Sequence, residues 1–521
     1  MRFRSKAAVP DPALRGPRTT GWPMFFAALA GAASVFSFAP FGWWPVQFFS
    51  LAFLFYQVGM DTRVKRSTLI GLAFGFGWSV ANIHWLYVSM HDYGGMHAAL
   101  TVAAICVLGL YMGAYSAIAT GFAAWLRNRW ALPVKSFLLL VLPISWATGE
   151  WLRGTVLTGF PWSASGYAHN ASPLGGYAPL VGVYGIGMLA ALCASCLAMV
   201  TQRARWYGLG LVAVILIAGY GLREIAWTHP QGESISVRLL QGNVPQNEKF
   251  DAQHVMSALE LYRKMITEQR ADLIAAPETA IVLFPRYLPP DYLPQLAAYA
   301  KSTDSALLFG IPLEDKPGDF AVSVAGISPQ GASYRYDKHH LVPFGEYVLT
   351  GFRWFVDMMN IPLGEATRGA AVQAPFAVKD QLVLPNICYE DAFGEEIAQQ
   401  LRATDTPATM LLNGSNLAWF GETIAIPQHL QISQMRTLET GRPMLRTTNT
   451  GATAVIDARG RLQAQLPMYQ RGTLSATVQG MGGMTPYIRV GNALFFLLAA
   501  AGLAAAWNSG RNYRKSAAKV T

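Results

Sequence analysis

Three short motifs carry the residue types that an activated thiol nucleophile needs. Glu278 lies in Ala-Pro-Glu-Thr-Ala, Lys338 in Tyr-Asp-Lys-His-His, and Cys388 in Asn-Ile-Cys-Tyr-Glu. A thiol needs a base to become a thiolate, and a buried carboxylate can accept that proton. A fixed ammonium favours the thiolate and stabilises the oxyanion that forms after nucleophilic attack. Each residue alone is typical of a surface or a core, so the catalytic interpretation depends on all three together.

Cys388 follows the apolar run Leu382–Ile387, which predicts a buried strand. At a strand end, a sharp turn exposes a nucleophile while the sheet holds it still. A buried structural cysteine is the alternative for such a residue, and the two distant motifs argue against it. The other cysteines, Cys106, Cys193 and Cys196, lie in apolar runs and are expected to be small core residues rather than a metal or redox site.

Three further residues are candidates for supporting roles beside the triad. Glu346 lies eight residues after Lys338 and is expected to orient its ammonium or activate a group, unless it is a surface carboxylate. Tyr389 directly follows the nucleophile and is expected to shape the pocket. Glu390 comes next and is expected to support the same site.

Trp419 and Phe420 follow an Asn-Gly-Ser-Asn loop and are candidates for binding acyl chains or sealing the mouth of the site; core packing is the open alternative. The adjacent His339 and His340 are expected to be structural. The histidines and cysteines show no metal-ligand spacing, so we expect no metal.

The polar part of the chain, residues 228–485, alternates strand-like and helix-like segments and predicts a layered α/β sandwich. The long, Gly- and Pro-rich segment 341–380 is expected to be a lid. Strands are expected at Ser234–Gln241, Asp272–Ala276, Ala306–Ile311, Ala321–Ser328, Ser333–Tyr336, Leu382–Ile387, Thr409–Leu412, Met444–Thr448 and Ala452–Asp457, and helices near Asp251–Ala271 and Pro290–Ser302.

The rest of the chain is strongly apolar. Of the 521 residues, 52% are hydrophobic and 13% are charged, against about 25% charged in an ordinary soluble domain. This composition predicts a membrane part of about eight helices. The apolar runs lie near Trp22–Phe38, Pro45–Val58, Thr68–Met90, Met96–Leu126, Ser136–Trp151, Pro179–Val200, Tyr207–Leu222 and Val490–Trp507.

The net charge of +10 comes from basic clusters between these runs, which indicates membrane orientation rather than nucleic-acid binding. The clusters occupy both tails and alternate loops, whereas the intervening loops of the first seven runs carry only Arg153. Both termini are therefore expected in the cytoplasm, with the polar part in the periplasm of a bacterial inner membrane. The predicted divisions are a basic tail over 1–21, about seven spans over 22–227, the catalytic part over 228–485, a last span over 486–508 and a tail over 509–521.

Two loops on the predicted periplasmic side are rich in glycine and aromatic residues, His91–Gly95 and Thr158–Tyr167. An aromatic belt at the headgroup level explains them, and so does a lipid-handling mouth beneath the catalytic part.

The three motifs resemble the Glu-Lys-Cys triad of the nitrilase, or carbon–nitrogen hydrolase, superfamily. Together with the apolar runs, the Gly-Phe-Pro-Trp loop, Gln241–Gln246 and Asn413–Asn416, they resemble the apolipoprotein N-acyltransferases, the membrane-embedded branch of that superfamily. The resemblance covers nearly the whole chain. It implies a polytopic helical membrane domain that carries a periplasmic, nitrilase-like αββα sandwich.

The resemblance also implies a ping-pong acyl transfer without a cofactor. The expected donor is a membrane phospholipid, through the sn-1 chain of phosphatidylethanolamine, and the acceptor is the α-amine of a diacylglyceryl-cysteine on an apolipoprotein. Glu278 serves as the base, Cys388 as the nucleophile, and Lys338 with a backbone N–H as the oxyanion site. A monomer is expected.

Two functions of other classes stay open on sequence alone. A membrane-anchored carbon–nitrogen hydrolase would release its acyl group to water. A transporter or lipid-binding protein would carry polar residues deep in its spans, and few are present.

Overall fold

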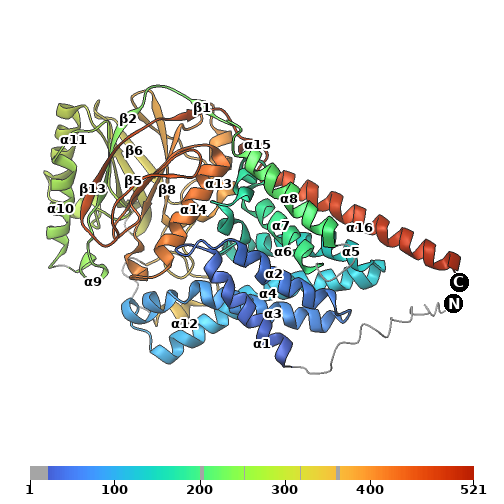
Figure 1. The fold of residues 1–521 in the computed structure, drawn as a ribbon. Helices are drawn as coiled ribbons and strands as arrows, with labels where there is room; N and C mark the ends of the chain where they lie inside the picture. The colour runs from blue at the N-terminus through green and yellow to red at the C-terminus, as the bar shows by residue number, and fades with distance from the viewer. Residues whose placement is uncertain (1–20, 200–204, 252, 317, 359–363, 521) are drawn as a thin grey trace.

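The computed structural model of the 521-residue chain describes residues 21–199, 205–251, 253–316, 318–358 and 364–520. Residues 1–20, which make up nearly all of the expected basic tail, lie outside these ranges. So does Arg203, which belongs to the basic cluster between the apolar runs Pro179–Val200 and Tyr207–Leu222. The chain forms a helical part and a sheet-containing part that pack side by side (Figure 1).

Each of the eight apolar runs contains a helix. The helices are α1 (Trp22–Ala33), α2 (Pro45–Gly59), α3 (Val64–Ile83), α4 (Ala98–Trp130), α5 with α6 (Val134–Ser136 and Leu142–Arg153), α7 (Ala178–Ala198), α8 (Arg205–Leu222) and α16 (Ala493–Val520). Within the described residues, three helical stretches are long and apolar enough to cross a membrane: Ala98–Trp130, Pro173–Ala198 and Ala493–Lys519.

Small residues allow the helices of this part to approach closely. A Cβ atom on Gly75 of α3 would lie 2.8 Å from the Cα atom of Gly113 on α4. Membrane helices associate through such contacts, because lipid tails remove the hydrophobic force that drives helices together in water.

The second part contains two six-stranded sheets in the described chain. One has the order β13-β2-β3-β4-β5-β6 and the other β12-β11-β10-β9-β8-β7. Parallel neighbours run at the centre of each, β2-β3-β4 and β8-β9-β10. The strands are β2 (Ile235–Gln241), β3 (Leu273–Ala275), β4 (Ala306–Lys316), β5 (Asp319–Ile327), β6 (Ser333–Asp337), β7 (Phe376–Val378), β8 (Gln381–Ile387), β9 (Met410–Ser415), β10 (Met444–Thr448), β11 (Ala454–Ile456), β12 (Leu462–Gln465) and β13 (Gly472–Val478).

Three apolar layers hold the sheets and their helices together. The central layer joins the two sheets through residues such as Leu239, Val383 and Leu412. A second layer packs α10 (Val255–Thr267) and α11 (Tyr292–Thr303) on the first sheet, and a third packs α13 (Gly394–Ala403) and α14 (Ala425–Thr440) on the other. The α/β sandwich predicted from the sequence is therefore confirmed, with the layer order αββα.

The structure contains elements that the sequence patterns did not predict. The short strands β7 and β12 lie at the edge of a sheet, where partial exposure weakens the alternation of apolar and polar residues. Helix α14 is nearly all buried and carries polar side chains on every face, so it lacks the amphipathic pattern that marks a helix.

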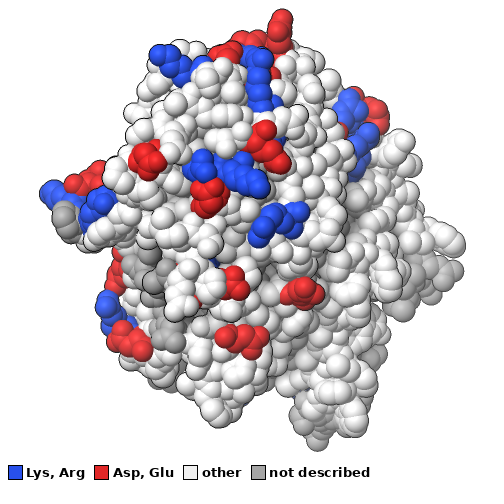
Figure 2. All heavy atoms as spheres, turned by 90° about the vertical axis from the view of Figure 1, so that its left-hand side faces the viewer, with Lys and Arg blue, Asp and Glu red and all other residues white. Residues whose placement is uncertain are grey.

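Helix α14 also joins the two parts of the molecule, because it contacts α7. The Trp162 indole donates to Gln428 Oε1 at 2.7 Å, and the Gln428 amide donates to Asn82 Oδ1 of α3 at 3.1 Å. Charged side chains of both signs lie over the sheet-containing part, whereas the helical part visible in Figure 2 shows almost none.

Candidate active site

Strand β8 delivers Cys388 to a strained turn. Cys388 opens the short helix η9 (Cys388–Ala392) with a φ of +51°, a left-handed conformation that is uncommon for residues other than glycine. The residue as a whole is half-buried. Its carbonyl accepts hydrogen bonds from Asn413 Nδ2 at 3.3 Å and from His429 Nε2 at 3.1 Å. The strained conformation of Cys388 is therefore held by two side chains from neighbouring elements.

The His429 donor is itself fixed by a buried arginine. Arg446 Nη2 lies 2.5 Å from His429 Nδ1, and a guanidinium can only donate, so Nδ1 accepts and Nε2 carries the proton. Burial and the neighbouring Arg446 charge hold the pKa of His429 well below its ordinary value. The imidazole is therefore neutral and positions the Cys388 backbone, without acting as an acid.

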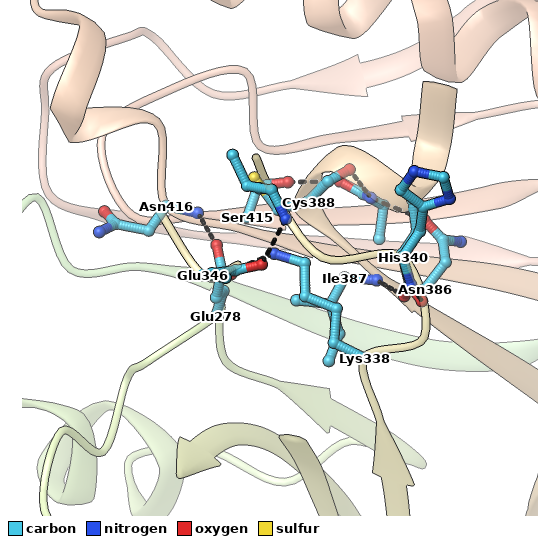
Figure 3. A network of polar contacts seen from close by, with 12 residues as sticks. Glu278, Lys338, His340, Glu346, Asn386, Ile387, Cys388, Ser415 and Asn416 are labelled. Atoms are coloured by element: carbon cyan, nitrogen blue, oxygen red, sulfur yellow. Dashed lines mark hydrogen bonds and ion pairs between the residues drawn. The ribbon is translucent and has the colours of Figure 1, made fainter. Parts of the chain in front are cut away.

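Lys338 stands at the end of β6 and binds two carboxylates. Its Nζ lies 3.2 Å from Glu278 Oε1 and 2.7 Å from Glu346 Oε1, and its side chain is fully buried (Figure 3). Burial acts against its charge, but the charges of Glu278 and Glu346 outweigh burial and raise its pKa. The ammonium is therefore permanently charged in the site.

Glu278 follows β3 in a loop that requires a glycine beside it. A Cβ atom on Gly310 of β4 would come within 2.6 Å of the backbone around Glu278, so only glycine lets the loop pack there. The second carboxylate oxygen of Glu278 accepts from the Asn416 backbone N–H at 2.8 Å. The sheet thus places this carboxylate against Lys338 with one defined orientation.

Glu346 orients the ammonium from the other direction. Its Oε2 accepts from the Val342 backbone N–H at 2.9 Å while its Oε1 holds Lys338. Burial raises its pKa, and Lys338 opposes that rise. Glu346 therefore lies beside Lys338, where the sequence led us to expect it.

Glu390 joins the lysine motif to the cysteine motif. It accepts from the backbone N–H groups of Ile387 at 2.6 Å, His339 at 2.6 Å and His340 at 3.2 Å, and from the Tyr336 hydroxyl at 3.1 Å. Burial raises its pKa to about 7, although these backbone bonds oppose the shift. It thus stabilises the relative position of Lys338 and Cys388, and the Lys338 charge also acts on it.

The aromatic candidates lie where the two parts of the molecule meet. The Tyr389 hydroxyl donates to Gly159 O at 2.9 Å, and the Phe420 ring lies 4.6 Å from that of Trp85. Trp419 lies 6.1 Å from Tyr93, and both Trp419 and Phe420 are partly exposed. These rings and the two glycine- and aromatic-rich loops therefore form one region beside Cys388.

The electrostatics of the site keep Cys388 protonated at rest. Burial raises the pKa of its thiol, the charges of Glu278 and Glu346 raise it further, and Lys338 lowers it. Nucleophilic attack therefore requires a base. The Tyr389 N–H lies in the first turn of η9, where helix N–H groups lack an intrahelical acceptor and can bind an oxyanion.

Several residues of the site could not be predicted individually from the sequence. Asn413 and Asn416 fall in a motif that was singled out without assigning them a role. Lys249, His429 and Arg446 gave no signal, because single polar residues in buried elements follow no spacing rule. Among the residues described, no group of three or more His, Cys, Asp or Glu side chains is arranged to hold a metal ion.

The sandwich part of the chain matches a known class of proteins. Residues 236–487, which form the αββα sandwich, match the carbon–nitrogen hydrolase family model. Among solved structures, the chain is similar to a CN-hydrolase superfamily protein from Xanthomonas campestris, at 16% identity and a TM-score of 0.38, covering 51% of this chain and 97% of that one.

The other half of the chain specifies the family. Residues 30–196 match the model of the apolipoprotein N-acyltransferase N-terminal domain. The chain is 50% identical to the apolipoprotein N-acyltransferase of Ralstonia nicotianae over 90% of both chains, and 44% identical to that of Nitrosomonas europaea over 92% of this chain and 96% of the relative. The chain belongs to the apolipoprotein N-acyltransferase family.

Proposed function

We propose that this protein acylates the N-terminus of apolipoproteins by a ping-pong reaction through a thioester on Cys388. The observation that carries the proposal is the convergence of Glu278, Lys338 and Glu346 beside Cys388, at the junction with an apolar helical part. The site supplies a base, a fixed cation and a thiol, and the helices supply access to substrates that live in a bilayer.

In the first half-reaction, Glu278 takes the proton of the Cys388 thiol, and the sulfur attacks an ester carbonyl of a phospholipid. Lys338 and the Tyr389 N–H stabilise the oxyanion. The intermediate collapses by breaking the ester C–O bond, and Glu278 returns its proton to the departing lysophospholipid. The proposed donor chain is the sn-1 acyl group of phosphatidylethanolamine.

In the second half-reaction, the free α-amine of a diacylglyceryl-cysteine attacks the thioester carbonyl. Glu278 accepts a proton from the amine, the C–S bond breaks, and Cys388 regains a proton. The product is an amide, which is more stable than a thioester, so the transfer runs in one direction. The same base and oxyanion site therefore serve both halves.

The distances support different roles for the two carboxylates. Glu346 holds the Lys338 ammonium at 2.7 Å, whereas Glu278 lies 3.2 Å from it. The closer ion pair suits a residue that orients the cation, and the longer one suits a residue whose proton content changes during the reaction. Trp419 and Phe420, which line the junction, are proposed to contact acyl chains.

The proposed placement in the membrane follows the helices and the basic loops. Residues 22–227 would cross about seven times and residues 486–508 once, with residues 228–485 in the periplasm and both tails in the cytoplasm. The match between eight apolar runs and helices supports this arrangement, as does the alternation of basic loops. A monomer is sufficient, because every proposed group comes from one chain.

The deciding experiment is the intact mass of the purified protein after incubation with phosphatidylethanolamine alone. The proposal expects a gain of one acyl chain that hydroxylamine removes and that maps to Cys388. The Cys388→Ala variant is the matched control and should gain nothing. Recovery of unchanged substrate and unmodified wild-type protein would overturn the proposal and favour an amidase or a lipid-binding protein.

A further inference from the structure

A second lysine lies beneath the catalytic base. Lys249 ends the short helix α9 (Gln246–Lys249), and its side chain is 1% exposed. Its Nζ donates to the backbone carbonyl of Glu278 at 3.3 Å, which is the one hydrogen bond of this ammonium that the described residues provide. A buried ammonium is costly unless nearby charges compensate it, so this position calls for an explanation.

The segment around Lys249 is anchored to the same backbone that holds Glu278. Gln246 Oε1 accepts from Asn416 Nδ2 at 3.0 Å, and the Asn416 backbone N–H in turn binds the Glu278 carboxylate. Asn449 exchanges two hydrogen bonds with the backbone of Val244, at 3.0 and 2.8 Å. Helix α9 is thus built into the site, which makes an accidental approach of Lys249 to Glu278 a poor explanation.

The carboxylates of the site outnumber the ammonium that lies between them. Lys338 faces two carboxylates, Glu278 and Glu346, so the group carries an excess negative charge before any thiolate or oxyanion forms. The titratable groups that act on Lys249 are Glu278, from the loop after β3, and Cys388, from the end of β8. An ammonium at this position therefore opposes the excess charge and stabilises a negatively charged sulfur or oxyanion.

We propose that Lys249 is a positioning residue of the acyl-transfer site, which fixes the backbone of Glu278 and supplies the second positive charge against the two carboxylates. The inference rests on the proposed thioester mechanism. Lys249 acts through Glu278 and through the field at the sulfur, and it touches no reacting atom.

This role has a distinct dependence on pH. Burial lowers the pKa of Lys249 to about 7, although its electrostatic interactions with Glu278 and Cys388 oppose the shift. The ammonium is present below that pH and is lost above it. The benefit of having lysine at position 249 should therefore be greatest near pH 6 and should shrink as the pH rises to 9.

The test measures the rate of thioester formation by quenched intact mass, with the full-length protein in detergent and phosphatidylethanolamine, between pH 6 and pH 9. Lys249→Met keeps the length of the side chain without the charge. We expect it to be slower than wild type by on the order of tenfold or more near pH 6, with the difference narrowing at higher pH. The exposed lysine of α11 provides the matched control, and Lys301→Met should follow wild type throughout.

A second variant, Lys249→Arg, keeps the test informative if the methionine variant fails to fold. Because arginine stays charged, this variant should lose less activity than wild type between pH 7 and pH 9. A rate for Lys249→Met that equals wild type, or that falls by one factor at every pH, would overturn the inference; so would an arginine variant with the pH profile of wild type. A wild-type protein that forms no thioester would overturn the proposed function itself, which separates the two failures.

Discussion

The active site has a fixed half and an open half. Cys388 and Lys338 directly follow sheet strands, and buried side chains, among them Glu390 of η9, bind the backbone around both. Glu346 instead comes from segment 341–358, whose helix α12 (Arg353–Val356) is partly or fully exposed and whose Trp354 is 61% exposed. The backbone around Cys388 and Lys338 is therefore held by buried side chains, whereas the segment that carries Glu346 also presents large exposed side chains.

The largest effect should come from removing the cation of the fixed half. Lys338→Met leaves Glu278 and Glu346 without their shared partner and removes the oxyanion donor, so thioester formation should fall by roughly 10²–10³-fold. Quenched intact mass with phosphatidylethanolamine measures it. The exposed Lys316 supplies the control, and Lys316→Met should retain the wild-type rate. A loss of less than about threefold in Lys338→Met would contradict the assigned role.

The support of the nucleophile should matter almost as much, and for a different reason. Arg446 fixes His429 and also lies 3.5 Å from the buried Asp391, so Arg446→Met leaves a buried carboxylate without its cation. Breaking such a pair costs about 3–5 kcal/mol of unfolding free energy. Denaturant unfolding measures this loss.

His429→Ala tests the same support without an unpaired charge. It removes one donor to the Cys388 carbonyl and should slow thioester formation by about tenfold, with a smaller loss of stability than Arg446→Met. Equal stability losses in the two variants would show that the arginine acts only through the histidine.

A change in the open half should be milder. Glu346→Gln keeps an oxygen for Lys338 and removes one negative charge, so the ammonium loses part of its support and the rate should fall by roughly tenfold. The unfolding free energy should change little, because glutamine keeps the size of the side chain and an oxygen for Lys338. A loss as large as that of Lys338→Met would mean that Glu346 takes part in proton transfer.

The smallest effect should come from the exposed tryptophan of the open half. Trp354→Ala changes no group of the triad. The rate of acylation by a short-chain, water-soluble ester should therefore stay within about twofold of wild type, and the free energy of unfolding within about 0.5 kcal/mol. With phospholipid in a bilayer the rate should fall further, because the indole suits the headgroup region. Equal effects on both donors would place Trp354 in the site rather than at the membrane.

The residues of the fixed half could be predicted from the sequence more readily than the buried residues that hold them in place. Glu278, Lys338 and Cys388 stand beside strands that show clear apolar runs, and the sheet brings Lys338 and Glu278 within hydrogen-bond distance. Arg446 and His429 could not be found in this way, because their partners are distant in the sequence and a buried polar residue has no periodic pattern.

Helix α14 and Lys249 show the same limit of prediction from the sequence. Helix α14 escaped prediction because its environment is protein on all sides, and neither amphipathicity nor strong propensity marks such a helix. Lys249 lies in a polar stretch where a solvated lysine is the ordinary expectation. Only the packed fold shows that the stretch is enclosed.

The burial of α14 bears on the order in which the chain is assembled. Most of the surface that receives this helix, including α7 and the loop that carries Trp162, lies earlier in the sequence and leaves the ribosome first. The receiving surface therefore exists before the helix is synthesised. Expressed without residues 22–227, the sandwich would expose both the Arg436–Glu439 pair and the ring of Tyr389. Chaperones would then bind it and proteases would degrade it, as they do with incompletely folded proteins.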